Sequence, residues 1–168
     1  MQTLPDLLAP NLRLVFIGTA AGAVSARVGA HYANASNKFW PTLHAVGLTP
    51  TQLQPHDFVR LLDFGIGLTD LCKTHSGMDR AIPPAHFDVA ALRDKLTLAK
   101  PRAIAFTSKT GAALYLSTTT RALALGQQKR TGEDEPLIFV LPSPSGAAGP
   151  HWRIAPWREL AAWFHAGA

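Results

Sequence analysis

The chain has 168 residues, of which 47% are hydrophobic and 16% charged, and it carries a net charge of +5 at pH 7. This length suits a single domain with one core, and the composition excludes an intrinsically disordered chain. No apolar run approaches the roughly 20 residues of a membrane-spanning helix, and we expect no signal peptide and no membrane partner. One cysteine, Cys72, excludes an intrachain disulfide and favours the cytoplasm.

The first half of the chain alternates predicted strands and helices. A β-rich apolar segment at 12–18 predicts a buried strand, and an apolar stripe at 37–47 predicts a helix that ends at a glycine. Residues 55–65 predict a second helix, whose inward residues are expected to be Phe58, Leu61 and Leu62. A shorter apolar segment, 64–71, predicts the next strand.

The second half repeats this alternation. Helical patterns cover 86–101, 110–126 (as one or two short helices) and 155–168, and buried strands are predicted at 102–108 and 136–142. Between them, the polar segment 126–136 predicts a surface loop. Strands that alternate with helices predict an α/β fold, a three-layer α/β/α sandwich with a short, mainly parallel central sheet. We expect one domain over residues 1–168.

Polar and small residues gather where the predicted strands end. Those carboxyl ends carry "GTAAG", "GLTD", "TSKTG" and "LPSPSGAAG", and ligands of such folds bind at this edge of the sheet. "GTAAG" (residues 18–22) matches neither the dinucleotide-binding nor the phosphate-loop glycine pattern, and "SPSGAAG" is no nucleophile elbow. The histidines show no metal-ligand spacing, so we expect no metal and no cofactor. Either the amides of the first loop bind an anion or a base carbonyl, or the loop is only a tight turn.

Three motifs together resemble a known family. "GTAAGAVSARVGAHYANASNKFW", "LLDFGIGLTDL" and "LPSPSGAA" occur in this order in the uracil-DNA glycosylase superfamily, and the likeness runs from about Leu12 to the final helix. It is strongest to the mismatch-specific uracil-DNA glycosylase and thymine-DNA glycosylase family. The resemblance implies a uracil-DNA glycosylase-like fold and an enzyme of base excision repair. Such an enzyme flips a base out of DNA and hydrolyses its N-glycosidic bond without a cofactor.

The resemblance also implies the partner. We expect DNA that contains uracil or a mismatched or deaminated base, bound by a monomer with a modest basic face. The alternative is that the net charge of +5 reflects a slightly basic protein that has no polyanionic partner.

One departure from the family pattern concerns the catalytic residue. The family has an asparagine that positions the attacking water where this chain has Ala20, and a methyl group cannot orient water. Asp70, at the end of the second predicted strand, is our candidate replacement, because a carboxylate can accept a proton from water and stabilise an oxocarbenium-like sugar. The alternative is that Asp70 caps the turn that follows the strand.

The other predicted site residues follow from the same motifs. Tyr32 aligns with the aromatic residue that stacks on the flipped base, and Asn37 either ties the first loop in place or caps the helix that follows. The predicted base-binding residues are Gly18, Thr19, Ala20, Ala21, Gly22, Tyr32 and Asn37. The predicted DNA-binding residues are Ser25, Lys38, Lys109, Ser143, Ser145, Gly146 and Ala147.

Two other functions remain open from the sequence. The chain could be a non-catalytic protein that binds lesion DNA or free nucleobases and has lost the catalytic asparagine. It could also be an unrelated α/β enzyme for a small phosphorylated or nucleoside substrate. The second reading predicts no preference for lesion DNA over plain duplex.

Overall fold

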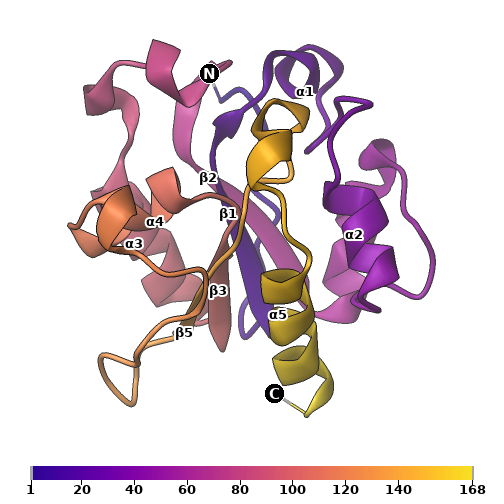
Figure 1. Cartoon of the computed structure of the whole chain (residues 1–168), viewed down its shortest axis with the longest axis vertical. Coiled ribbons are helices and arrows are strands. Elements are labelled where there is room, and N and C mark those ends of the chain that lie inside the picture. The colour runs from indigo at the N-terminus through magenta and orange to yellow at the C-terminus, as the bar shows by residue number, and fades with distance from the viewer. Residues whose placement is uncertain (1, 168) are drawn as a thin grey trace.

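A five-stranded sheet forms the centre of the protein in the computed structural model, which describes residues 2–167 (Figure 1). The strand order is β2-β1-β3-β5-β4. Four strands pair in parallel, namely β1 (Leu14–Ala21), β2 (Ile66–Ser76), β3 (Ala103–Phe106) and β5 (Leu137–Val140). The short β4 (Gly126–Gln127) pairs antiparallel with β5. The mainly parallel sheet predicted from the sequence is therefore confirmed.

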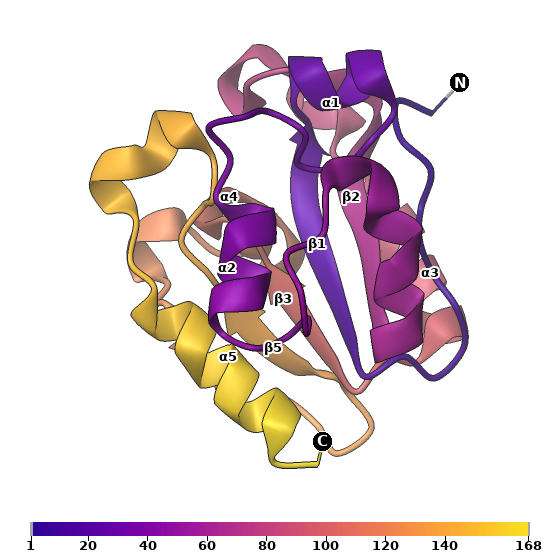
Figure 2. The same ribbon diagram turned by 90° about the vertical axis from the view of Figure 1, so that its right-hand side faces the viewer.

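Helices cover both faces of the sheet (Figures 1 and 2). One face packs against α2 (Phe39–Ala45), α5 (Ala155–His165) and the 3-10 helix η1 (Pro55–Phe64). The other packs against α3 (Val89–Ala99) and α4 (Lys109–Leu116). Strand β1 serves both layers, because successive side chains point to opposite faces: Leu14 and Phe16 join the first cluster, Val15 and Ile17 the second. This arrangement confirms the three-layer α/β/α sandwich.

The remaining helical elements are short. They are α1 (Ala23–Val28) and the 3-10 turns η2 (Asp79–Ala81), η3 (Pro84–His86), η4 (Thr120–Ala122) and η5 (Gly146–His151). The segment 110–126 thus holds all but the first residue of α4 and the turn η4, in line with the expected short helices. Within residues 2–167, no helix has the length and apolar character to cross a membrane.

Strands β1 and β2 are longer than predicted. β1 continues to Ala21 and β2 to Ser76, so most of "GTAAG" is strand and not loop. The pairing runs on through Gly18↔Asp70 and Ala20↔Cys72, and the register shifts in a bulge between Ala20 and Ala21. Pairing between the two strands stabilises both of them beyond their apolar segments. This is a tertiary effect, and the small residues of the motif do not predict it.

The predicted second helix is also corrected. Residues 55–64 form a 3-10 helix, in which side chains three apart eclipse one another. Leu61 is consequently buried and Phe58 packs partly against the core, whereas Leu62 is 37% exposed. The inward position predicted for Leu62 assumed α-helical geometry and is wrong.

Candidate active site

A cavity of about 800 Å³ opens at the carboxyl ends of the parallel strands. Its walls come from the end of β1 with the turn after it, the loop before α2, the loop after β2, and the loop after β5. Most of the predicted site residues lie in these walls; those that line the cavity are Gly18, Thr19, Ala20, Ala21, Gly22, Ser25, Tyr32, Asn37, Asp70, Ser143, Ser145, Gly146 and Ala147. The structure therefore brings the three sequence motifs together.

Asp70 is a buried carboxyl in the lining of this cavity. It stands beside Gly18 in the β1–β2 register, and its side chain is only 6% exposed. Its Oδ1 lies over Gly18, where a Cβ atom would overlap the carboxylate, so this position requires glycine. Gly18, Tyr32 and Asp70 are called the cavity floor below. Because Asp70 lies inside β2 and six residues before its end, the alternative of a turn cap is wrong.

One charged neighbour acts on the Asp70 carboxylate at close range. Lys73 Nζ lies 3.6 Å from Asp70 Oδ2, and this oxygen accepts no hydrogen bond from the described residues. Burial raises the pKa of Asp70 above its ordinary value, while the positive charge of Lys73 acts in the opposite direction. Asp70 is thus a carboxyl whose basicity is increased by its surroundings and that is accessible from the cavity.

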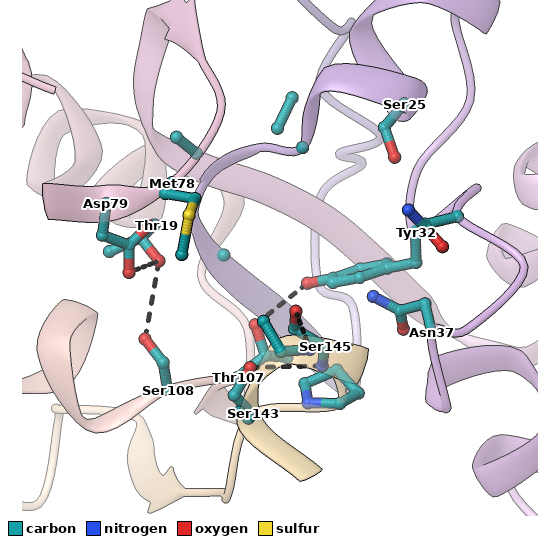
Figure 3. A pocket seen from close by; sticks show the side chains of 18 of the residues that line it. Thr19, Ser25, Tyr32, Asn37, Met78, Asp79, Thr107, Ser108, Ser143 and Ser145 are labelled. Atoms are coloured by element: carbon teal, nitrogen blue, oxygen red, sulfur yellow. Dashed lines mark hydrogen bonds between the residues drawn. The ribbon is translucent and has the colours of Figure 1, made fainter. Parts of the chain in front are cut away.

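Tyr32 forms a rigid side of the floor. Its ring stacks on Phe39 with centroids 3.9 Å apart and planes inclined by 20°. Its hydroxyl oxygen lies 3.1 Å from Thr107 Oγ1, a contact drawn in Figure 3. Burial raises the pKa of Tyr32, so the phenol stays neutral. The stack on Phe39 and the hydroxyl contact with Thr107 both hold the ring in place, and a ring held in this way is suited to stack on a planar ligand.

Asn37 and Ser25 fix the wall that carries Tyr32. Asn37 Oδ1 accepts a hydrogen bond from Phe39 N at 2.9 Å, which leaves the amide nitrogen directed toward the cavity in Figure 3. Ser25 is buried, and its Oγ accepts from Ala33 N at 2.9 Å. Its side chain thus ties the loop before α2 to α1, and its contact with a DNA phosphate stays a prediction.

The loop after β5 packs against the loop before α2. Lys38 N donates to Pro144 O at 2.8 Å, and a Cβ atom at Gly146 would lie 2.7 Å from Ser36 Cβ. Within the loop, Ser143 Oγ accepts from Ser145 N at 3.2 Å. The second glycine motif is thus explained by a close approach of two loops, and Ala147 is exposed at its tip.

Two predicted DNA-binding lysines lie outside the cavity lining. Lys38 Nζ is 5.8 Å from the centre of the Trp152 ring, beside the loop after β5. Lys109 is the first residue of α4, on the opposite layer of the sheet. Their contacts with DNA remain predictions.

Sequence reasoning missed the loop after β2. Met78, Asp79 and Arg80 line the cavity, and Met78 is 52% exposed. Thr19 Oγ1 donates to Asp79 Oδ2 at 3.0 Å (Figure 3), and burial raises the pKa of Asp79 although this hydrogen bond opposes the shift. The predicted strand stopped at Leu71, and only the five further residues of β2 carry this loop to the cavity. The loops 77–81 and 143–147 are called the cavity rim below.

The chemistry of the described residues offers no metal site. No group of three or more His, Cys, Asp or Glu side chains within residues 2–167 is arranged to hold a metal ion. Apart from Arg80, His31 and His151, the polar side chains of the cavity are carboxyls, hydroxyls and amides, which can hydrogen-bond a polar ligand.

Comparison with known proteins places the chain in a family. The model of the uracil DNA glycosylase superfamily matches residues 5–164. The chain is also similar to a solution NMR structure of a candidate uracil DNA glycosylase from Methanosarcina acetivorans, with 23% identity over 96% of each chain and a TM-score of 0.65. This second likeness supports the fold. Because the family model covers nearly the whole chain, the protein belongs to the uracil DNA glycosylase superfamily.

Proposed function

We propose that the protein is a monofunctional DNA glycosylase that excises uracil, and other deaminated bases, from DNA by hydrolysis. The superfamily implies DNA as the substrate. The observation that carries the proposal is the position of Asp70, a buried carboxyl at the floor of the cavity, beside the strand whose Ala20 lacks a polar side chain. Within the superfamily, the resemblance to the mismatch-specific and thymine-specific enzymes remains part of this proposal.

The floor and walls of the cavity suit a flipped base. A base inside a duplex shields its glycosidic bond, so the nucleotide must rotate out of the stack before reaction. Tyr32 would stack on the flipped base, and the Asn37 amide nitrogen would donate to one of its carbonyl oxygens. Main-chain amides around Thr19 to Gly22 are further candidates for these oxygens.

Asp70 would supply the chemistry that Ala20 cannot. As the bond between C1′ and the base nitrogen breaks, its electron pair leaves with the base and positive charge develops on the sugar. The Asp70 carboxylate would stabilise this charge and take a proton from water as the water oxygen bonds to C1′. Donors to the base oxygens would stabilise the departing anion. The departing anion then takes up one proton, either the proton held by Asp70 or one from solvent, so the products are the free base and an abasic site.

A second function is favoured by one specific observation. Ala20 removes the family's water-positioning side chain, so the cavity could recognise lesions without cutting. In that case Asp70 would only contact the base or balance the charge of Lys73.

The decisive experiment is cleavage of a labelled duplex that carries one G·U pair, with hypoxanthine, xanthine and undamaged duplexes alongside. Alkali-sensitive cutting at the lesion alone supports the glycosylase. Lesion-specific binding without cutting supports the second function, a non-catalytic protein that binds lesion DNA. No preference for any lesion contradicts both and favours a different α/β enzyme.

Asp70→Asn then tests the mechanism. General-base catalysis contributes about 10² to 10⁴ in rate, so we expect a loss of that size with lesion binding largely retained. Unchanged turnover would exclude Asp70 from the chemistry.

A further inference from the structure

An N-terminal segment that no motif includes forms part of the wall behind the cavity floor. Leu7 pairs with Leu68 of β2 in an antiparallel bridge, with N···O distances of 2.8 and 2.9 Å, and Thr3 N donates to Lys73 O at 2.8 Å. Leu4 is buried and lines the cavity. The segment thus continues the sheet beyond β2 and stands next to the strand that carries Asp70 (Figure 2).

Asp6, in the middle of this segment, is the centre of a charge cluster. Its Oδ1 accepts from Thr69 Oγ1 at 2.7 Å and lies 2.9 Å from Lys73 Nζ. Its Oδ2 lies 2.6 Å from Lys95 Nζ on α3. Burial alone would raise the pKa of Asp6, but the ammonium groups of Lys95 and Lys73 and the hydrogen bond from Thr69 outweigh burial and lower it. Asp6 is therefore a stable anion.

Lys73 lies between this anion and the candidate catalytic carboxylate. Its Nζ is 2.9 Å from Asp6 Oδ1 but 3.6 Å from Asp70 Oδ2, and its side chain is only 12% exposed. The ammonium is thus held closer to Asp6 than to Asp70. A cation in contact with a carboxylate lowers its pKa and makes it a weaker base, whereas burial without a cation raises the pKa. A cation held at a greater distance lowers the pKa less, so the carboxylate remains the stronger base.

We propose that Asp6 and Lys73 are positioning residues for Asp70, in which Lys73 keeps Asp70 ionised and Asp6 holds Lys73 back from a tight ion pair with it. This inference rests on the proposed role of Asp70 in base excision. It gives the N-terminal segment a part in the reaction, although none of its charged groups touches the substrate.

Two other titratable groups face Asp70. His31 Nε2 donates a hydrogen bond to Pro5 O at 2.9 Å, and burial lowers the pKa of the ring, so His31 is neutral at neutral pH. Tyr32 is neutral as well, since burial raises its pKa. Among the described residues whose charges act on Asp70, Lys73 thus supplies the cation and Asp6 the anion at neutral pH.

The two substitutions should act in opposite directions. Lys73→Met removes the cation, so the acid limb of the kcat/KM profile moves to higher pH by about 1 unit. Asp6→Asn removes an anion and frees Lys73 to approach Asp70, so the limb moves to lower pH by a comparable amount. Lys95→Met is the matched control, because it breaks another ion pair of Asp6 without removing a charge that faces Asp70; we expect little shift.

The same titration is measured without catalysis by following the Asp70 Cγ NMR signal with pH in the full-length wild type and in each variant. Opposite shifts for Asp6→Asn and Lys73→Met, with little shift for Lys95→Met, support the inference. Shifts in one direction, or none, overturn it. If Lys73→Met does not fold, Lys73→Gln carries the same prediction. Absence of cleavage by the wild type would contradict the proposed function, whereas the NMR titration still tests the positioning of Asp70.

Discussion

The floor and the rim of the cavity are built in different ways. Floor residues are held by regular structure: Gly18 and Asp70 are paired in neighbouring strands, and Tyr32 is stacked on Phe39. The rim depends on single hydrogen bonds in loops, such as that from Thr19 to Asp79, and presents Met78 to solvent.

This difference indicates that the floor and the rim have different functions. Groups that react need fixed positions, because displacement by about 1 Å can cost 10²-fold in rate. Groups that contact the varied surface of DNA can be mobile. We therefore expect substitutions in the floor to change the rate of excision strongly and substitutions in the rim to act weakly or on binding.

After Asp70→Asn, Gly18→Ala should produce the largest loss. The new methyl group overlaps Asp70 Oδ1, so the carboxylate must move, and we expect excision to fall about 10²-fold. Overpacking should also lower the free energy of unfolding by about 1–3 kcal/mol. Single-turnover cleavage and urea denaturation measure the two effects.

The control for Gly18→Ala is Gly149→Ala. No atom lies within 4 Å of a Cβ placed at Gly149, so excision should be unaffected there. Equal activity of both variants would mean that the position of Asp70 does not matter.

Tyr32→Ala should have the next largest effect. Stacking of a base on an aromatic ring is worth about 1–3 kcal/mol, so excision and affinity for lesion DNA should fall roughly 5- to 150-fold. Tyr32→Phe keeps the stack on Phe39 and loses only the contact with Thr107, so its loss should be several times smaller. Measurement of kcat and of the dissociation constant separates the two contributions. If both variants lost the same activity, the hydroxyl and not the ring face would be the important group.

Much of the fold could be predicted from the sequence because its signals are local. Apolar strands alternate with amphipathic helices, and Ser108 and Asp88 cap the helices that follow them. The ends of β1 and β2 could not be predicted in this way. Gly18, Ala20 and Ala21 belong to residue types that are depleted in strands, and they are in a strand because β2 continues beside them.

The same limit explains which parts of the site were found. Ordered motifs identified both glycine motifs and Asp70, because each lies directly after an apolar segment of the sequence. Asp79 and Lys73 depend on the true length of β2, and Asp6 depends on the pairing of the N-terminal segment with that strand. No local pattern reports a pairing between residues more than sixty positions apart.

Asp6→Asn tests how much the cluster behind the floor contributes to stability. A carboxylate whose pKa is lowered in the folded state stabilises the protein above its unfolded-state pKa of about 3.9, and this contribution disappears as the pH falls through the folded pKa. We expect a loss of about 1–3 kcal/mol at pH 7 and a smaller difference from wild type below about pH 4. Denaturation at both pH values measures it, with Asp134→Asn in an exposed loop as the control. A difference independent of pH would contradict an ionic origin.

Asp79→Asn should have the smallest effect and is the sharpest comparison with Asp70→Asn. The asparagine oxygen can still accept the hydrogen bond from Thr19, so excision should change less than about fivefold, which corresponds to roughly 1 kcal/mol. Because burial raises the pKa of Asp79, its ionised form costs stability above that pKa, and the variant should be at least as stable as wild type at pH 7. Parallel cleavage assays and thermal unfolding of the two variants decide the matter. Should Asp79→Asn abolish excision while Asp70→Asn does not, the reacting carboxylate belongs to the rim, and Asp70 instead reads the base or balances Lys73.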